Sequence, residues 1–115
     1  MKKYPSFKID FLGCKITVIF DKDWRDIARK ILKRPLKTDD SEVKSNAMVI
    51  IFNQDYYLLS KQSVEYSILA HECFHLLMWI ANDFDIHFTA NNHEAMAYLL
   101  EYLIDEVMKI KKVKK

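Results

Sequence analysis

The residues in this sequence whose types and spacing could do chemistry form one short segment, His71-Glu72-Cys73-Phe74-His75, with the pattern HExxH. In a helix, residues four apart lie on the same face, so the two imidazoles could bind one zinc ion. Glu72 lies beside them but outside the ligand set, where a general base must lie to take a proton from a metal-activated water. The motif therefore predicts a zinc site with hydrolytic chemistry.

A catalytic zinc ion usually has three protein ligands and one open position, so the motif requires a third ligand. The candidates after the motif are Asp83, Asp85, His87, His93 and Glu94. We favour Glu94, which lies 19 positions after His75, at the start of the expected final helix. The loop before it is long enough to turn the chain antiparallel. His93 and His87 remain alternatives, and an acid that stabilises the helix dipole is the other interpretation of Glu94.

The motif lies in a run of apolar residues that predicts a helix from about 64 to 82. Apolar side chains occur on nearly all sides of this helix, so we expect it to be buried. Ionisable side chains on a buried helix are costly unless they are paired or bind a metal. The alternative to a zinc site is therefore a hydrogen-bonded pair of core histidines with Glu72 as their partner.

Strand patterns precede the motif helix. Residues 7–11 and 14–20 alternate around Gly13 and predict a hairpin, and residues 48–52 and 56–60 predict a second one. Between them, apolar residues at helical spacing predict a helix over 22–34 that Pro35 ends, followed by a polar loop over 36–46.

A final helix is expected over about 93–111, which completes the element order ββαββαα. Strands that come early and long helices that come last are typical of an α+β domain. We expect a mostly antiparallel sheet packed on one side against the motif helix and the C-terminal helix. At 115 residues the chain has material for a single domain spanning 1–115, with a basic tail at 109–115.

The sequence HECFH on one helix, followed by Glu94 at the head of the next, resembles the gluzincin arrangement of zinc metallopeptidases. Thermolysin-like and ImmA/IrrE-type peptidases share that layout, and the segment from Asn92 to Tyr102 is similar to the second motif of small HExxH proteins from phages and mobile elements. The resemblance covers residues of about 60–105. It implies a zincin-like fold and a metallopeptidase in which His71, His75 and Glu94 bind one Zn²⁺ per chain and Glu72 is the general base.

A peptidase of this kind also needs a place for its protein or peptide substrate. Zincins add the substrate as a strand to a sheet edge, which residues 48–52 or 56–60 could supply unless they form a fully paired inner strand. Tyr98, His87 and Tyr56 are candidates for stabilising the oxyanion. The alternative function is a non-catalytic, zinc-stabilised protein-interaction module.

Charge and composition exclude several other classes. The net charge is +2, but the last seven residues hold five lysines, so the remaining chain is mildly acidic and no nucleic-acid partner is expected. A single glycine excludes glycine-rich phosphate loops. Two cysteines are too few for a disulfide scaffold, and no apolar run is long enough for a signal peptide or a membrane span. We expect a reducing, cytoplasmic setting without membrane contact.

Overall fold

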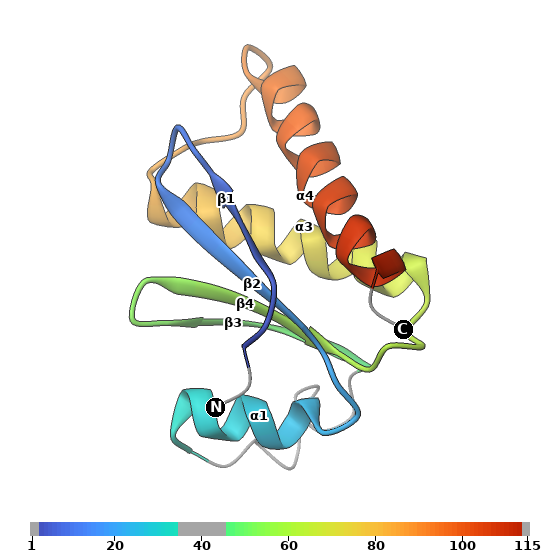
Figure 1. The fold of residues 1–115 in the computed structure, drawn as a ribbon. Helices are drawn as coiled ribbons and strands as arrows, with labels where there is room; N and C mark the ends of the chain where they lie inside the picture. The colour runs from blue at the N-terminus through green and yellow to red at the C-terminus, as the bar shows by residue number, and fades with distance from the viewer. Residues whose placement is uncertain (1–2, 35–45, 114–115) are drawn as a thin grey trace.

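The structure is a computed structural model that describes residues 3–34 and 46–113. The elements of these ranges follow the predicted order ββαββαα (Figure 1). They are β1 (Ser6–Ile9), β2 (Cys14–Phe20), α1 (Trp24–Leu32), β3 (Ala47–Phe52), β4 (Asp55–Ser60), α3 (Tyr66–Asp83) and α4 (His93–Val113). The predicted polar loop over 36–46 and the helix-ending Pro35 lie, apart from residue 46, outside the described residues.

Both predicted hairpins are confirmed. β1 pairs antiparallel with β2, and the turn between them uses Gly13 at a φ of 70°, a left-handed conformation that glycine adopts at little cost. β3 pairs antiparallel with β4 across a two-residue turn, in which Asn53 and Gln54 have φ values of 52° and 67°. Two positive φ values are typical of the type I′ turn, whose twist matches that of the flanking strands.

The described sheet is mixed, with the order β1-β2-β4-β3: two of its three strand pairs are antiparallel, as a mostly antiparallel sheet requires, and the third is parallel. Its two central strands, β2 and β4, run parallel, with Ile16 opposite Tyr56 and Phe20 opposite Ser60. A parallel pair requires a long crossover. The chain supplies one because α1, the segment after it and β3 all lie between the two strands in the sequence.

Helices cover both faces of the sheet (Figure 1): the expected packing on one side holds for α3 and α4 but not for α1. α3 and α4 cover one face, where Val18 and Leu58 are fully buried. α1 covers the other face through Trp24 and Ala28, which pack with Leu59. The central strands have apolar side chains on both sides, so each side has to be covered.

α3 is not buried all round, so that prediction is also wrong. One side of the helix contributes fully buried residues such as Leu69 and Leu76 to the core. The opposite side exposes Phe74, Met78 and Trp79, which keep 47%, 41% and 50% of their surface in contact with solvent. The reason is geometric, because the sheet and α4 reach only one side of α3. No helix in the described ranges is both long and apolar enough to span a membrane.

Candidate metal centre

The two motif histidines lie together on the exposed side of α3. Their Nε2 atoms are 3.0 Å apart, and their rings meet edge to face with centroids 4.6 Å apart. Both side chains are exposed, and neither belongs to the hydrophobic core. The alternative of a buried histidine pair therefore does not describe His71 and His75.

The spacing of the two imidazoles suits a shared metal ion. A tetrahedral zinc ion with bonds of about 2.0–2.1 Å holds two ligand nitrogens about 3.3 Å apart. The observed 3.0 Å between Nε2 atoms is close to that separation. Two donors of the right chemistry thus converge from adjacent turns of one rigid helix, as the i and i+4 spacing predicts.

Glu72 lies next to the pair and is half-buried on α3. Burial raises the pKa of its carboxyl group, and the adjacent His71 lowers it by a smaller amount. The next residue, Cys73, is fully buried on the core side, where burial raises the pKa of the thiol to about 12. Cys73 is therefore a small core residue and not a ligand of the same metal.

Glu94 is exposed in the first turn of α4, away from the histidine pair. At 100° per residue it lies about 180° around the helix from Leu103 and about 200° from Met96, both of which pack in the core with α3. Among residues 3–34 and 46–113, no three His, Cys, Asp or Glu side chains lie close enough together to hold a metal ion. The structure brings together His71, His75 and Glu72, but not Glu94.

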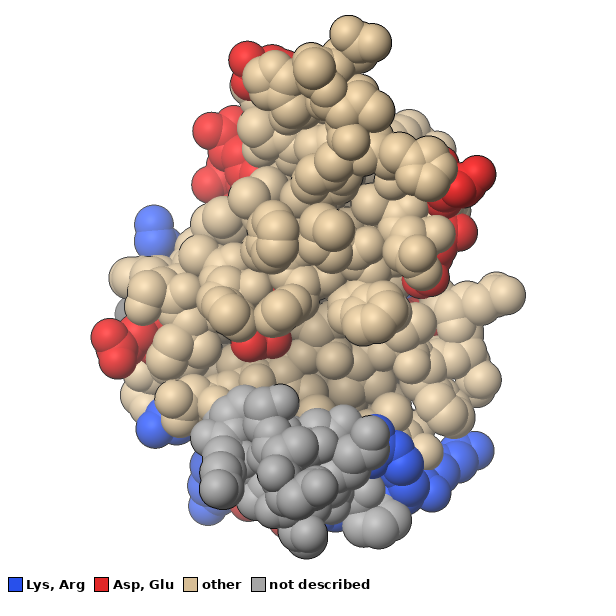
Figure 2. Space-filling model, turned by 180° about the vertical axis from the view of Figure 1, so that it is seen from behind, with Lys and Arg blue, Asp and Glu red and all other residues tan. Residues whose placement is uncertain are grey.

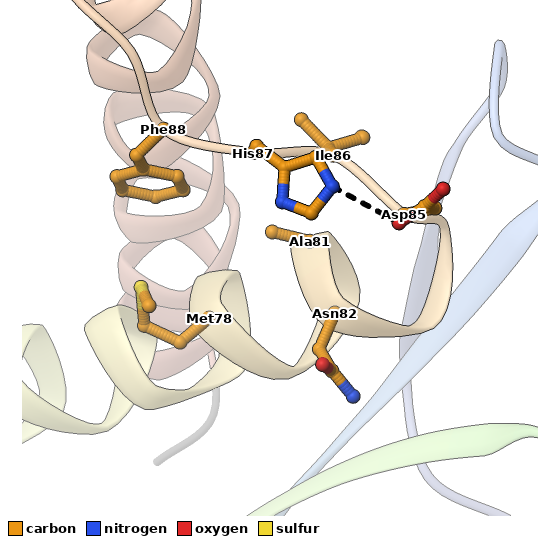
Figure 3. A pocket seen from close by; sticks show the side chains of 7 residues that line it. All are labelled: Met78, Ala81, Asn82, Asp85, Ile86, His87 and Phe88. Atoms are coloured by element: carbon orange, nitrogen blue, oxygen red, sulfur yellow. Dashed lines mark ion pairs between the residues drawn. The ribbon is translucent and has the colours of Figure 1, made fainter.

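Two of the alternative ligands lie beyond the end of α3, as Figure 3 shows. His87 Nε2 is 3.2 Å from Asp85 Oδ1, and both side chains are strongly exposed. The histidine lines a pocket of about 230 Å³ whose opposite wall includes Met78 and Phe88. Its backbone carbonyl accepts a hydrogen bond from the Asn92 amide, which helps to hold the loop that leads into α4.

Asp83 and the oxyanion candidate Tyr56 are partners of each other. The Tyr56 hydroxyl donates a hydrogen bond of 2.5 Å to Asp83 Oδ2 and so joins β4 to the end of α3. Burial and the Asp83 carboxylate raise the pKa of this hydroxyl well above its usual value. The other tyrosine candidate, Tyr98, is exposed on α4.

The strand next to the motif helix is a sheet edge. β4 is an inner strand between β2 and β3, so of the two candidates only β3 lies at an edge of the described sheet. A groove of about 320 Å³ runs along β3 and is lined by both sides of the strand, by Leu32 of α1 and by Trp79 of α3. Sequence reasoning missed Trp79, although its position four residues after His75 places it one turn further on the same face.

One long segment of the chain holds acidic residues without basic ones. Residues 62–108, which include α3 and most of α4, hold eight acidic residues and neither lysine nor arginine. In Figure 2 acidic side chains border the upper part of the molecule, most lysine and arginine side chains gather near its lower end, and a broad uncharged surface lies between them. The candidate metal centre therefore belongs to an acidic and aromatic part of the molecule.

The chain matches no protein-family model, no curated protein and no solved structure.

Proposed function

We propose that this chain is a zinc-dependent metallopeptidase. His71 and His75 hold the ion, Glu94 is the third protein ligand, and Glu72 is the general base. The observation that carries the proposal is the 3.0 Å distance between two exposed Nε2 atoms on one helix, directly beside a half-buried glutamate. A reducing, cytoplasmic setting belongs to the same proposal, and the two free, buried cysteines support it.

In the proposed reaction, the zinc ion and the side chains of the protein have different roles. When bound, zinc supplies a Lewis acid that makes water more acidic and polarises a peptide carbonyl. His71 and His75, held one turn apart on the same helix with their Nε2 atoms 3.0 Å apart, are the side chains that would hold the ion. Glu72 accepts the proton of the attacking water and gives it to the leaving amine, which requires a carboxyl group beside the ligands.

The edge of β3 is the proposed place for the substrate backbone. β3 and β4 close on a two-residue turn with Phe52 opposite Asp55, so Val49 and Ile51 direct their backbone N–H and C=O groups outward. An extended peptide could pair with these groups and place side chains in the groove beside Trp79. Trp79 is four residues from His75, about 6 Å along the helix axis, so the groove leads toward the histidine pair.

Glu94 as third ligand requires a local rearrangement. Its side chain leaves α4 on the side opposite the core, so the first turn of α4 has to move for the carboxylate to reach His71 and His75. We propose that zinc binding induces this movement. His93 and His87 are the alternative ligands if Glu94 does not move.

A second candidate function is a zinc-stabilised module that binds another protein without cleaving it. The exposed apolar side chains of Phe74, Met78 and Trp79 beside the histidine pair favour it. Such exposed groups on a small domain often mark a protein-binding surface. The two candidates share the metal and differ in turnover.

The metal content of the purified protein tests both candidates, with plasma mass spectrometry of the natural sequence, His71→Ala, Glu94→Ala and the matched control His87→Ala. We expect about one zinc ion per chain in the natural protein and in His87→Ala, and loss from the other two variants. Zinc retained in Glu94→Ala would move the third ligand to His93 or His87. Absence of metal after zinc is added would refute both functions.

Turnover separates the two candidates. A quenched-fluorescence library of peptides, incubated with the zinc-loaded protein, measures cleavage directly. We expect Glu72→Gln to keep zinc and the melting temperature while it loses at least 100-fold in rate, the loss typical of removing a general base. Cleavage that is unchanged in Glu72→Gln would exclude its role as base. Zinc without any cleavage would favour the non-catalytic module.

A further inference from the structure

A second groove lies away from the histidine pair, between the β1–β2 turn and the first half of α4. Its volume is about 500 Å³, and Ile9 and Leu99 are its most buried lining residues. Its walls are aromatic, with Phe11, Tyr98 and Tyr102 exposed to 78%, 65% and 39%. We call these three residues and the space between them the aromatic groove.

One wall of the aromatic groove, Tyr102, is held in place by contacts within the protein. The Tyr102 hydroxyl donates a hydrogen bond of 2.7 Å to the backbone carbonyl of Lys8, which joins α4 to β1. The ring of Tyr102 also packs edge to face on Phe7, with centroids 5.9 Å apart. A wall that is already ordered loses little conformational entropy when a ligand binds, which favours recognition.

Acidic side chains border this groove. Asp10 lines it directly. On α4, Glu94 and Glu101 lie four residues before and three residues after Tyr98, and residues at these spacings are neighbours on a helix surface. Asp10 and Glu106 both act on the Tyr102 hydroxyl, whose pKa is raised mainly by burial and then by these two carboxylates.

The nearby cations Lys8 and Lys109 offset one of these carboxylates, that of Glu106. Lys8 alternates along β1 with Phe7 and Ile9, which pack in the core beneath α4, so its side chain leaves the opposite face of the sheet. Lys109 forms an ion pair of 2.7 Å with Glu106 in the last part of α4. The aromatic groove thus combines an apolar floor with aromatic walls and a negative border.

We propose that the aromatic groove docks a lysine- or arginine-containing segment of another protein, anchored by an apolar side chain. Cations are attracted both to the faces of aromatic rings and to the bordering carboxylates. The apolar anchor would occupy the floor at Ile9 and Leu99. The acidic border disfavours nucleic acid and acidic peptides. The proposal does not rest on the metallopeptidase function, since it involves neither His71 nor His75, and Glu94 is the one border carboxylate that is also a proposed zinc ligand.

Fluorescence anisotropy with defined peptides tests the proposal on the full chain. The probe is a labelled 12-residue peptide that alternates lysine with leucine, compared with a peptide in which glutamate replaces every lysine. We expect the lysine peptide to bind and to weaken as salt rises from about 50 to 500 mM, because added ions screen the exposed carboxylates. Equal binding of the glutamate peptide would overturn the proposal.

Matched variants locate the binding. Tyr98→Ala removes a groove wall, whereas Phe88→Ala removes an aromatic side chain of the loop before α4 that is 44% exposed. Glu101→Lys reverses a charge at the groove, and Glu65→Lys reverses one next to the start of α3. We expect roughly tenfold weaker binding for Tyr98→Ala and Glu101→Lys, and less than twofold change for the two controls.

Other outcomes would overturn the proposal. Equal effects of Tyr98→Ala and Phe88→Ala would show non-specific adhesion to aromatic surface. Self-association that rises with protein concentration and disappears in Tyr98→Ala would assign the groove to a second copy of this chain. The circular-dichroism spectrum and melting temperature of each variant check the fold, and Glu101→Lys changes only an exposed side chain.

Discussion

The two faces of the sheet are covered by helices that differ in what they expose. α1 follows the ordinary amphipathic pattern, with Trp24 and Ala28 buried and exposed positions such as Arg29 and Lys30 charged. α3 buries an apolar side as well, but its outer side exposes histidines and large apolar side chains. Every large hydrophobic residue that the described part of the chain exposes lies outside α1.

This difference bears on where the proposed sites lie. A helix that only covers a sheet gains nothing from an apolar outer side, and α1 has none. Exposed apolar side chains lower the solubility of a protein. The outer side of α3 nevertheless carries Phe74, Met78 and Trp79 next to the histidine pair. We therefore place the proposed functional surfaces on the α3–α4 side of the molecule and at the edge of β3, and a mainly structural role on α1, of which Leu32 also lines the β3 groove.

The two tryptophans give the largest expected effect. Trp24 of α1 is 2% exposed, whereas Trp79 of α3 is 50% exposed. We expect Trp24→Ala to lower the free energy of unfolding by about 3–5 kcal/mol, because it leaves a cavity in the core. Trp79→Ala should change the free energy of unfolding by less than about 1 kcal/mol. The same variant should weaken the binding of a substrate peptide at the edge of β3. Urea titrations measure the free energy of unfolding of both variants. Equal losses in the two would remove the contrast between the two faces of the sheet.

Zinc should stabilise the protein through α3. At a zinc concentration 100 times the dissociation constant, binding raises the free energy of unfolding by about 2.7 kcal/mol. Thermal melts with and without zinc should show this gain in the natural sequence and in His87→Ala, but not in His75→Ala. A gain that persists in His75→Ala would locate the metal elsewhere and weaken the contrast between α3 and α1.

The hydrogen bond between Tyr56 and Asp83 should contribute a smaller amount to the free energy of unfolding, and this amount should depend on pH. Tyr56→Phe removes the hydrogen bond that the hydroxyl donates to the Asp83 carboxylate. The loss lowers the free energy of unfolding by about 1.5–3 kcal/mol at neutral pH where the carboxylate is left without a partner, and by less where a water molecule takes the place of the hydroxyl. Because this carboxylate is exposed to water, we expect about 1 kcal/mol.

The sign of the pH effect follows from the raised pKa of Tyr56. Above pH 10.0, its ordinary value, the unfolded chain loses the phenol proton while the folded chain keeps it. Stability should therefore be constant below that pH and fall as pH rises above it. Tyr56→Phe should show a shallower alkaline decline than the natural sequence in urea titrations between pH 8 and 11. Identical slopes of the free energy of unfolding against pH would show that the titration of Tyr56 does not cause the alkaline decline.

Much of the local structure could be predicted. The hairpins depend on alternating strands and on turns at Gly13 and Asn53-Gln54, where short-range sterics decide the conformation. The closeness of His71 and His75 follows from helical geometry alone. The burial of α3 was overestimated, because an apolar helix surface says nothing about how much of it a small domain can cover.

The sequence by itself determined the element order ββαββαα, the two hairpins and the convergence of two imidazoles on one helix, since each depends on residues close together in the chain. Only the tertiary structure decided the parallel pairing of β2 with β4, the edge position of β3, the side of α4 on which Glu94 lies and the joining of β1 to α4 that forms the aromatic groove. These features depend on contacts between distant segments, and such contacts are set by how the whole core buries its apolar surface.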